Sequence, residues 1–379
     1  MTRARSIADI GDDVAGGGSL VTTSSPSLGR RNLIINGAMQ VAQRGTSFTQ
    51  NPNTGNYHTV DRFSYRREGT WTNVTAVNLS QETSSPPEGF AYYHRYSTTG
   101  NEAATSDAGM SMMHKLERNT TDCLAWGTSN AKQATLSFYV RSSVTGTFSV
   151  LLEYLRADSS KVNHVSEYTI DSANTWERKV ITINGPATGG SYSDPTAESI
   201  TFRFYVAGDV TSAYTQPSLN QWDAVSRRWS ENQSTLVTST PGATWDITGI
   251  QFEVGSVSTP YEHRSYGEEL ALCQRYCHVI NTGGVNYAHI AIQAGDSSGE
   301  SFAYIDFPQT MRAFPSLTSS ATSTFYLSFF TASGGPNINN SGFHGCTLQF
   351  TGSGGTAGKT GRLLSNSTNV AELIFDAEL

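Results

Sequence analysis

Charge, cysteine and long apolar runs are all scarce in this sequence, and each shortage excludes a class of protein. Only 15% of its 379 residues are charged, which is too few for a disordered polyelectrolyte. The formal net charge of -7 disfavours a nucleic-acid binder, because neutralising phosphates requires a basic surface. The basic pairs at 30–31, 66–67 and 227–228 are isolated from one another and form no basic stripe.

Membrane and secretion signals are missing as well. No window approaches the roughly 18 to 20 apolar residues of a membrane span. The first residues, MTRARSIADIGDDVAGGGSLV, contain arginines but no apolar core, so we expect no secretory signal. Four cysteines in this length are too few for a disulfide scaffold, which indicates synthesis in a reducing cytoplasm. No cofactor is indicated.

Gly, Ser, Thr and Asn are abundant, and 37% of the residues are hydrophobic. This mixture predicts many short strands joined by polar turns. In QATLSFYVRSS the alternation places Leu136, Phe138 and Val140 on one face of a strand. The next segment, GTFSVLLEYLRA, follows the turn-like SSVTG, and together they predict an antiparallel hairpin.

Further strands are expected in WERKVITING, ESITFRFYVAG and TWDITGIQFEVG. In the second of these, the apolar side chains at even positions from Ile200 to Val206 alternate with Thr201, Arg203 and Tyr205. This alternation predicts one buried face and one solvated face, as in a β-sandwich. A second β unit begins after residue 280, with strands in NYAHIAIQAG, ESFAYIDFPQTMRAFPSLTSSA, FYLSFFTASG, HGCTLQFTGSG and VAELIFDAEL.

A short helix is predicted between the two β units. Ser265 and Glu268 have the spacing of a capping box. An apolar stripe at helical spacing follows: Tyr266, Leu270, Cys273 and Cys277. Free cysteine packs as a small hydrophobe, and the spacing of this pair differs from the C-x2-C of structural zinc sites. We therefore expect both cysteines to be packing residues and predict no metal site.

No arrangement typical of a catalytic site is present. The serine after Gly109 fails the G-x-S-x-G pattern at its fifth position, and the eight histidines fall in no recognisable motif. The glycine-rich GSGGTAGKTG around Lys359 lacks the helix of a phosphate-binding loop and is interpreted as a turn between strands. We predict no catalytic residue and no enzyme. A glycosidase site formed by two carboxylates from separate strands stays an open alternative.

Aromatic side chains are the candidates for ligand binding. Exposed rings can stack on the faces of sugars, while polar side chains hydrogen-bond the hydroxyl groups. Rings cluster with arginines in VDRFSYRREGTW and FAYYHRYS, and QWDAVSRRWSENQ places two tryptophans in a polar loop. The predicted saccharide-binding residues are Tyr65, Trp71, Tyr92, Tyr93, Trp222 and Trp229. The alternative is that these rings fill the core of the sandwich.

Two of these pairs carry a further expectation. Tyr92 and Tyr93 are adjacent, so in a strand they point to opposite faces and one of them is expected to be exposed. Trp222 and Trp229 are expected to form a contact surface for a ligand or for a neighbouring subunit.

Three stretches resemble a recurrent module of tailed-phage virion proteins. They are RRNLIINGAMQVAQRGTSF at 31–48, HTVDRFSYRR at 58–67 and WDITGIQFEVGSVSTPYEHRSYGEELALCQRYC at 245–277. The module is common in tail fibre and receptor-binding proteins and is similar to the jelly-roll sandwiches of carbohydrate-binding modules. Cys277 departs from the module, in which an aromatic residue follows LCQRY. The residues after 280 show no such resemblance.

The resemblance completes the expected architecture, which is all-β. We expect a virion-attachment arm at 1–29, a jelly-roll β-sandwich at 30–264, a capped linker helix at 265–280 and a smaller β-sandwich-like domain at 281–379.

The resemblance also implies a role. We expect a virion structural protein that is made in the host cytoplasm and is located in the tail fibre more than on the capsid surface. It would be a homotrimer, would join other virion proteins through residues 1–29, and would recognise a host-surface glycan without catalysis. Two alternatives stay open: a capsid decoration or cement protein, and a polysaccharide depolymerase, although the repeat of a long β-helix is absent.

Overall fold

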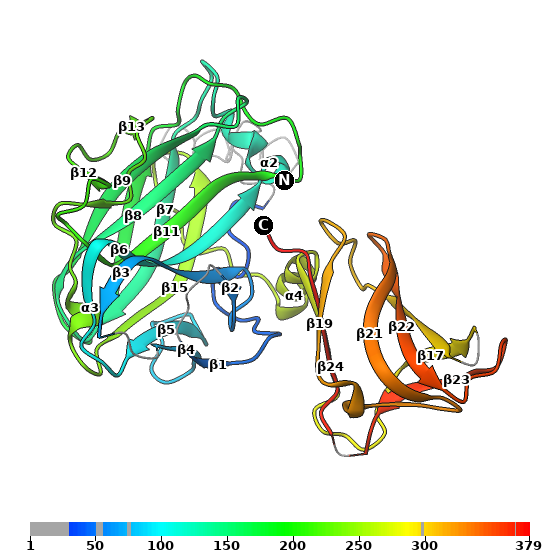
Figure 1. Ribbon diagram of the computed structural model, residues 1–379. Coiled ribbons are helices and arrows are strands. Elements are labelled where there is room, and N and C mark those ends of the chain that lie inside the picture. The colour runs from blue at the N-terminus through cyan, green and yellow to red at the C-terminus, as the bar shows by residue number, and fades with distance from the viewer. Residues whose placement is uncertain (1–29, 51–55, 74–76, 297–298, 368) are drawn as a thin grey trace, which may run out of the picture.

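The computed structural model describes residues 30–50, 56–73, 77–296, 299–367 and 369–379. Figure 1 shows two β domains side by side, with the helix α4 (Tyr266–Gln274) between them and the last residues of the sequence at the same junction. The arm expected at 1–29 lies outside the described residues. In the described part of the chain, no helix is long and apolar enough to cross a membrane.

The first domain is a sandwich of two antiparallel sheets. Sheet A has the order β1 (Ser47–Gln50), β4 (Val77–Glu82), β5 (Tyr93–Thr98), β15 (Thr244–Val254), β7 (Ala134–Ser142) and β10 (Glu177–Ile183). Sheet B has the order β13 (Trp222–Asp223), β9 (Lys161–Ile170), β8 (Gly146–Leu155), β11 (Glu198–Gly208), β6 (Ala103–Glu117), β3 (Phe63–Thr72) and β2 (Asn56–Tyr57). The chain passes repeatedly from one sheet to the other, and the inner faces form one core. The prediction of an all-β sandwich is confirmed.

Short elements complete this domain. The parallel pair β12 (Thr215–Gln216) and β14 (Trp229–Ser230) and the helix α3 (Leu236–Ser239) lie in the connection from β11 to β15. The helix α2 (Arg118–Thr121) and the 3-10 turn η2 (Asp122–Leu124) follow β6. The connection from β11 to β15 covers part of the outer face of sheet B.

The predicted hairpin of β7 and β8 is wrong. β7 pairs with β10 and β15 in sheet A, whereas β8 pairs with β9 and β11 in sheet B. Leu136, Phe138 and Val140 are buried together, as expected. The short connection therefore crosses from one sheet to the other. Alternation shows which side chains face the core, but it does not show whether the next strand pairs beside the first or opposite it.

The solvated face predicted for β11 is also wrong. Thr201, Arg203 and Tyr205 are nearly as buried as the apolar residues between them. Arg203 donates from Nε to Glu153 at 2.8 Å, and the ring of Trp229 packs against Tyr205 with centroids 5.2 Å apart. The connection from β11 to β15 brings this tryptophan over the outer face of sheet B, so both faces of β11 are covered.

The second domain is a smaller sandwich, as predicted. Its larger sheet has the order β20 (Phe325–Leu327), β23 (Thr360–Ser365), β17 (His289–Gly295), β18 (Glu300–Asp306), β22 (Gly345–Ser353) and β21 (Thr331–Ser341). Its smaller sheet has the order β16 (Cys277–Asn281), β24 (Glu372–Asp376) and β19 (Ser316–Ser319), and η3 (Thr322–Thr324) precedes β20. The sheets enclose a separate core that includes Leu348, Phe350 and Phe375. The segment with Lys359 connects β22 to β23, which confirms its interpretation as a turn.

The helix α4 begins as predicted but ends early. The Ser265 hydroxyl accepts from the backbone N–H of Glu268, whose carboxylate accepts in return from the backbone N–H of Ser265. The helix ends at Gln274, and Cys277 is already the first residue of β16. The expected helix at 265–280 is therefore wrong beyond residue 274, because the last residues pair with β24. Cys273 and Cys277 are both fully buried, which confirms that they are packing residues.

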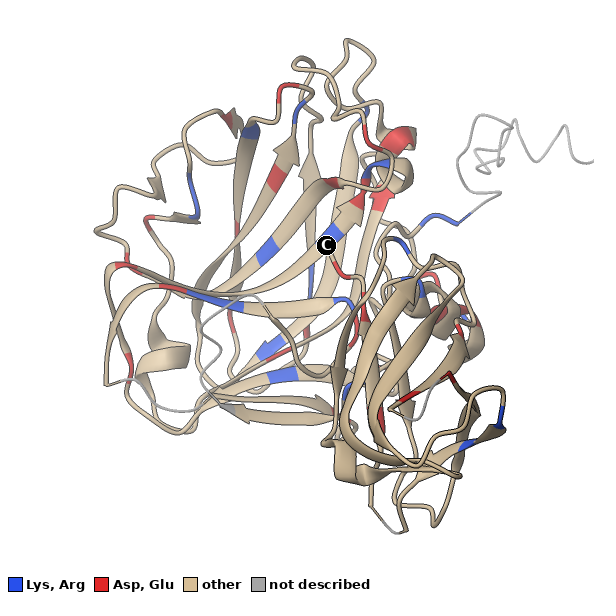
Figure 2. Ribbon diagram, turned by 45° about the vertical axis from the view of Figure 1, so that its right-hand side comes forward, with Lys and Arg blue, Asp and Glu red and all other residues tan. Residues whose placement is uncertain are grey.

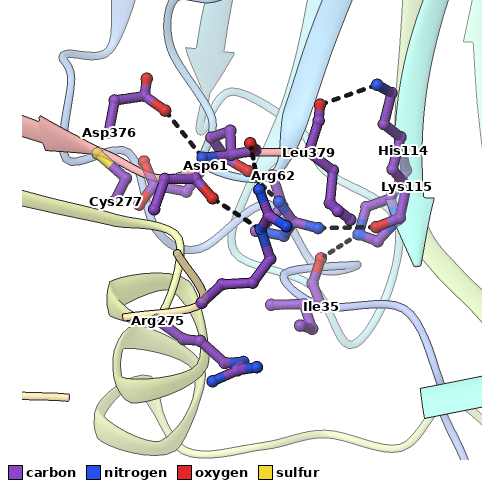
Figure 3. A network of polar contacts seen from close by, with 12 residues as sticks. Ile35, Asp61, Arg62, His114, Lys115, Arg275, Cys277, Asp376 and Leu379 are labelled. Carbon is purple, nitrogen blue, oxygen red and sulfur yellow. Dashed lines mark hydrogen bonds and ion pairs between the residues drawn. The ribbon is translucent and has the colours of Figure 1, made fainter. Parts of the chain in front are cut away.

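A buried arginine connects the two domains (Figure 3). Arg62, from the segment before β3, forms an ion pair with Glu378 and donates to the carbonyl oxygen of Lys115 at 2.7 Å. The ammonium of Lys115 in turn donates to the carbonyl oxygen of Leu379 at 2.8 Å. The end of the described chain is thereby attached to strands of the first domain.

A second set of ion pairs surrounds this arginine. Arg44 pairs with Asp376 at 2.9 Å and lies 4.0 Å from the buried Asp61, and burial raises the pKa of Asp61 to about 6. Arg275, directly after α4, donates to both carboxylate oxygens of Glu117 at 3.1 and 2.9 Å. Because these partners are largely buried, the junction is a fixed joint and not a flexible linker.

Candidate functional site

An open pocket on the outer face of sheet A is lined by a group of aromatic rings. Its volume is about 480 Å³. Four rings meet there: Phe90 lies 5.4 Å from Tyr139, 5.0 Å from Tyr261 and 5.3 Å from His263, measured between centroids. The four residues come from three separate segments of the chain, so the fold assembles them.

A bulge in β15 makes room for these rings. The pairing of β15 with β7 shifts register between Thr248 and Gln251. Gly249 lies in this bulge with a φ of +62°, and a Cβ there would lie 2.6 Å from the ring of Phe90 and 3.0 Å from that of Tyr139. Glycine is therefore required twice, for the backbone conformation and for the space that the rings occupy.

Side chains of β15 fix the loop that carries two of the rings. The carboxylate of Glu253 accepts from the backbone N–H of Thr259 at 2.8 Å and from its hydroxyl at 2.7 Å. The side-chain oxygen of Gln251 accepts from the backbone N–H of Glu262 at 2.8 Å. These contacts hold the loop against the strand, so the far wall of the pocket is positioned before any ligand arrives.

Polar groups lie at the rim of the pocket. Arg178, on β10, is exposed and donates to the hydroxyl of Ser258 at 3.0 Å and to the carbonyl oxygen of Thr259 at 3.1 Å. Arginine has five N–H groups, so this fixed guanidinium can also donate to a ligand. Glu88 is exposed and lines the same pocket, where its carboxylate can accept. The rim therefore offers both a donor and an acceptor beside the rings.

A buried carboxylate orders the neighbouring part of the same face. Asp246 accepts from Arg95 at 2.8 and 2.9 Å and from Arg141 at 2.9 and 2.8 Å. Both guanidinium groups lie over the ring of Tyr93, 5.5 and 5.1 Å from its centroid. Arg141 is two residues from Tyr139 on β7, so this cluster and the pocket share one face of the sheet.

This arrangement is suited to binding. Ring faces, a guanidinium and a carboxylate surround an open depression, and burial raises the pKa of Tyr261 so that the phenol stays neutral. Among the residues that the structure describes, no group of three or more His, Cys, Asp or Glu side chains could hold a metal ion.

Three of the residues predicted from the sequence lie inside the protein. Tyr65 is 1% exposed, and its hydroxyl lies 3.0 Å from Nδ1 of His94. Trp71 is 9% exposed and lies under the guanidinium of Arg67. Trp229 is fully buried, because paired glycines on β6 and β11 leave space for its ring. The prediction of a contact surface at Trp229 is therefore wrong, because its ring packs on the outer face of sheet B.

Of the other three, Tyr92 and Trp222 are partly accessible and Tyr93 is buried. Trp222 is half-buried, donates from Nε1 to the carbonyl oxygen of Asn184 at 2.6 Å and packs against Trp126. Tyr92 packs towards the core, whereas Tyr93 faces outwards, which confirms that they point to opposite faces. Tyr93 is nevertheless 1% exposed because Arg95 and Arg141 cover its ring, so the expectation of an exposed, sugar-binding ring at Tyr93 is wrong. The structure does not bring the six together, and saccharide binding by Tyr92 and Trp222 stays a prediction.

The sequence contains weak signals for the residues that do form the pocket. Phe90 ends the turn-rich stretch PPEGF, and Tyr261 and His263 lie in the stretch TPYEH directly after the last strand of the domain. Tyr139 occupies the outward position of an alternating strand. Loop residues positioned by a rigid sheet often bind ligands, but only the fold shows that these loops converge.

No protein-family model and no curated protein matches the sequence. Among solved structures, the enzymatically active domain of tailspike protein 4 from bacteriophage CBA120 is 13% identical with a TM-score of 0.32, covering 59% of this chain and 21% of that one. The match thus spans about a fifth of the length of that domain.

Carbohydrate-binding modules match over their whole length. The xylan-binding domain CBM22-2 of Paenibacillus barcinonensis Xyn10C is 14% identical with a TM-score of 0.29, covering 55% of this chain and 99% of that one. TmCBM61, solved with β-1,4-galactotriose, is 9% identical with a TM-score of 0.29, covering 60% and 100%.

Proposed function

We propose that the first domain binds a saccharide without altering it, in the pocket formed by Phe90, Tyr139, Tyr261 and His263. The observation that carries this proposal is the convergence of four rings beside the exposed Arg178 and Glu88 in a pocket of about 480 Å³. A sugar ring offers an apolar face for the aromatic groups and hydroxyls for the polar rim. An open, shallow site suits a weak ligand that is bound many times over.

The proposed biological role is that of a receptor-binding subunit of a tailed-phage virion. The resemblance of residues 31–48, 58–67 and 245–277 to the virion module supports this role. In such a particle, several linked copies would act at high effective concentration, so weak sites would together hold the host surface. The homotrimer and the attachment through residues 1–29 belong to this proposal.

Glycan-array screening of the purified chain, followed by calorimetric titration of the best ligand, tests the binding proposal. Tyr139→Ala and Arg178→Gln should each weaken binding by about tenfold, because each removes a contact in the pocket. Tyr266→Ala is the matched control, since this ring is 55% exposed on α4 outside the pocket. Binding that both pocket variants leave unchanged would contradict the proposal.

Separate measurements distinguish the alternatives. New reducing ends after incubation with host capsule or lipopolysaccharide would indicate a depolymerase. Light scattering gives the oligomeric state. Labelling in the intact virion, with and without residues 1–29, separates a tail fibre from a capsid decoration: copies spread over the capsid would contradict the fibre role.

A further inference from the structure

The second domain contains few positively charged side chains, and its two exposed ones lie in one region. Residues 281–379 contain only Arg312, Lys359 and Arg362. Arg312 lies at the junction between the domains, where it donates to the carbonyl oxygens of Ala377 and Glu378, both at 2.9 Å. Figure 2 shows how few segments of this domain are blue. The two remaining cations are exposed, and both belong to one small region of the larger sheet.

That region is a pocket of about 470 Å³ on the outer face of the larger sheet. Arg362 on β23 is paired with Ile292 on β17, and both line the pocket together with His289 and Phe329. The ammonium of Lys359 lies 3.7 Å from the centroid of the Phe329 ring. A ring, a guanidinium and an imidazole therefore line one depression, and the ammonium of Lys359 lies beside it over the ring of Phe329.

Phe329 is held there in a conformation that its side chain disfavours. Its φ is +64°, in the left-handed region that bulky residues rarely adopt, and its side chain is 59% exposed. It lies in a tight turn in which the backbone N–H of Phe330 donates to the carbonyl oxygen of Leu327 at 3.3 Å. Glycine would adopt this φ without strain and would expose no apolar ring to solvent. Strain that displays an apolar ring to solvent points to a role in binding.

The neighbouring strands hold this turn from both sides. The backbone N–H of Ser328 donates to the carbonyl oxygen of Arg362 at 3.0 Å, and the buried Gln293 amide donates to the carbonyl oxygen of Ser328 at 2.5 Å. A Cβ on Gly361 would lie 2.6 Å from the Gln293 amide nitrogen and 2.9 Å from Ser328. The turn is thus positioned by the sheet, so the ring is fixed in advance.

Opposite charge is missing from this pocket. Among the described residues, neither Lys359 nor Arg362 forms an ion pair with a carboxylate, whereas most arginines of the first domain do. Carboxylates do not line the pocket either. The two cations are therefore available to an anion from outside.

We propose that this pocket is a second binding site, for an acidic saccharide whose carboxylate or other oxyanion contacts Arg362 and Lys359 while its sugar face packs on Phe329. A sugar acid supplies an apolar ring face and an anionic group in one small unit, and the pocket supplies the complement of each. This site goes beyond the function proposed for the first domain, and either site can exist without the other.

The experiment uses one saccharide in two charge states. The full chain is titrated calorimetrically with a short oligogalacturonate and with the same oligosaccharide fully methyl-esterified, which keeps the sugar faces but removes the charge. We expect the acid form to bind at least about tenfold more tightly, since contacts to charged groups are the stronger ones. Inorganic phosphate should compete, and raising the salt concentration should weaken the acid form selectively.

Three variants locate the site. Arg362→Gln and Lys359→Gln should each lower the affinity for the acid form by about tenfold. Phe329→Gly should lose binding while the protein unfolds at an equal or higher urea concentration, because glycine relieves the strained φ. Lys132→Gln, an exposed lysine of the first domain outside both pockets, is the matched control and should leave this binding unchanged, while Arg178→Gln reports any binding in the first domain. A Phe329→Gly variant that is less stable would contradict the strain argument.

The opposite results overturn the proposal. Equal affinity for the acid and esterified forms, no binding of either form, or acid binding that survives both Arg362→Gln and Lys359→Gln would each exclude this site. Binding that is lost only in Arg178→Gln would assign the acidic saccharide to the first domain instead. Failure of the first-domain proposal leaves these readouts unaffected.

Discussion

The guanidinium carbon of Arg62 lies 3.4 Å from the centroid of the Tyr276 ring, and neither side chain is accessible to solvent. Arg62 belongs to the first domain, and Tyr276 lies between α4 and the first strand of the second. The arginine also pairs with Glu378, so one buried cation contacts both ends of the second domain. This contact explains why a sequence with two separate cores folds with a fixed joint between them.

Removing the partner of this cation should destabilise the protein strongly. Glu378→Gln leaves the charge of Arg62 buried without its carboxylate, and we expect a loss of about 3–5 kcal/mol in the free energy of unfolding, measured with urea. Arg66→Gln is the control, because its side chain is 45% exposed in the pair with Glu68 and its loss should cost below about 1 kcal/mol. Similar losses in the two variants would show that the joint does not depend on this pair.

The four cysteines should differ sharply in reactivity. Cys123 is exposed, whereas Cys273, Cys277 and Cys346 are buried. Desolvation raises the pKa of all four thiols, that of Cys346 to about 11 and those of Cys273 and Cys277 well above their ordinary value, so the contrast in reactivity rests on access to the reagent. A thiol reagent should therefore label Cys123 alone in the folded protein and all four in urea. Rapid labelling of Cys273 or Cys277 in the folded state would contradict their assignment as packing residues.

The double variant Cys273→Ala with Cys277→Ala complements this measurement. It should lower the free energy of unfolding by about 1–3 kcal/mol through lost packing and leave saccharide binding unchanged. Stoichiometric zinc in the native protein that disappears from the double variant would instead identify a metal site.

Stability should fall in mild acid because of a buried histidine. Burial lowers the pKa of His94 to about 3 from its ordinary 6.5, so the folded protein keeps this ring neutral while the unfolded chain protonates it. Above about pH 6.5 both states keep His94 neutral, so this ring does not lower the free energy of unfolding. As the pH falls from 6.5 towards 3, protonation of the unfolded chain lowers that free energy, by about 2 kcal/mol at pH 5. Asp61, whose pKa is raised, acts in the opposite direction between about pH 4 and 6.

The variant His94→Gln measures how much His94 adds to the pH dependence of stability. His94→Gln should show a smaller loss of unfolding free energy between pH 7 and pH 5 than the natural sequence, whatever its stability at pH 7. Asn130→Gln, at an exposed position without a titratable group, is the control and should keep the original pH dependence. Equal slopes for the natural sequence and His94→Gln would show that another group controls acid stability.

Local patterns in the sequence predict local structure well here. Alternation correctly identifies the buried side of β7, and the Ser265–Glu268 spacing correctly identifies the start of α4. Both depend on residues a few positions apart, whose geometry is fixed by one strand or one helical turn. The same kind of argument fails at Cys277, since pairing with β24, almost 100 residues away in the chain, replaces the last helical turn.

The candidate sites depend on contacts that are distant in sequence. Trp229 appears in a polar stretch, yet it is buried because a long connection places it over two facing glycines. Phe90, Tyr139 and Tyr261 are ordinary aromatic residues in three separate segments, and only the packing of those segments on sheet A brings them together. Composition can show that rings are present, but it cannot show which of them cover a core and which line a pocket.

The bulge at Gly249 offers a direct test of the first-domain pocket. Gly249→Ala adds a Cβ within 2.6 Å of Phe90 at a φ of +62°, so we expect it to displace the rings and abolish saccharide binding. Gly242→Ala is the matched control, because Gly242 has a φ of +77° but no atom within 4 Å of an added Cβ. The control should lose about 1 kcal/mol from backbone strain alone, and Gly249→Ala about 1–3 kcal/mol more from overpacking. Urea unfolding measures the difference in stability and calorimetry measures the binding. If both variants bind equally well, the rings around Gly249 are not the saccharide site.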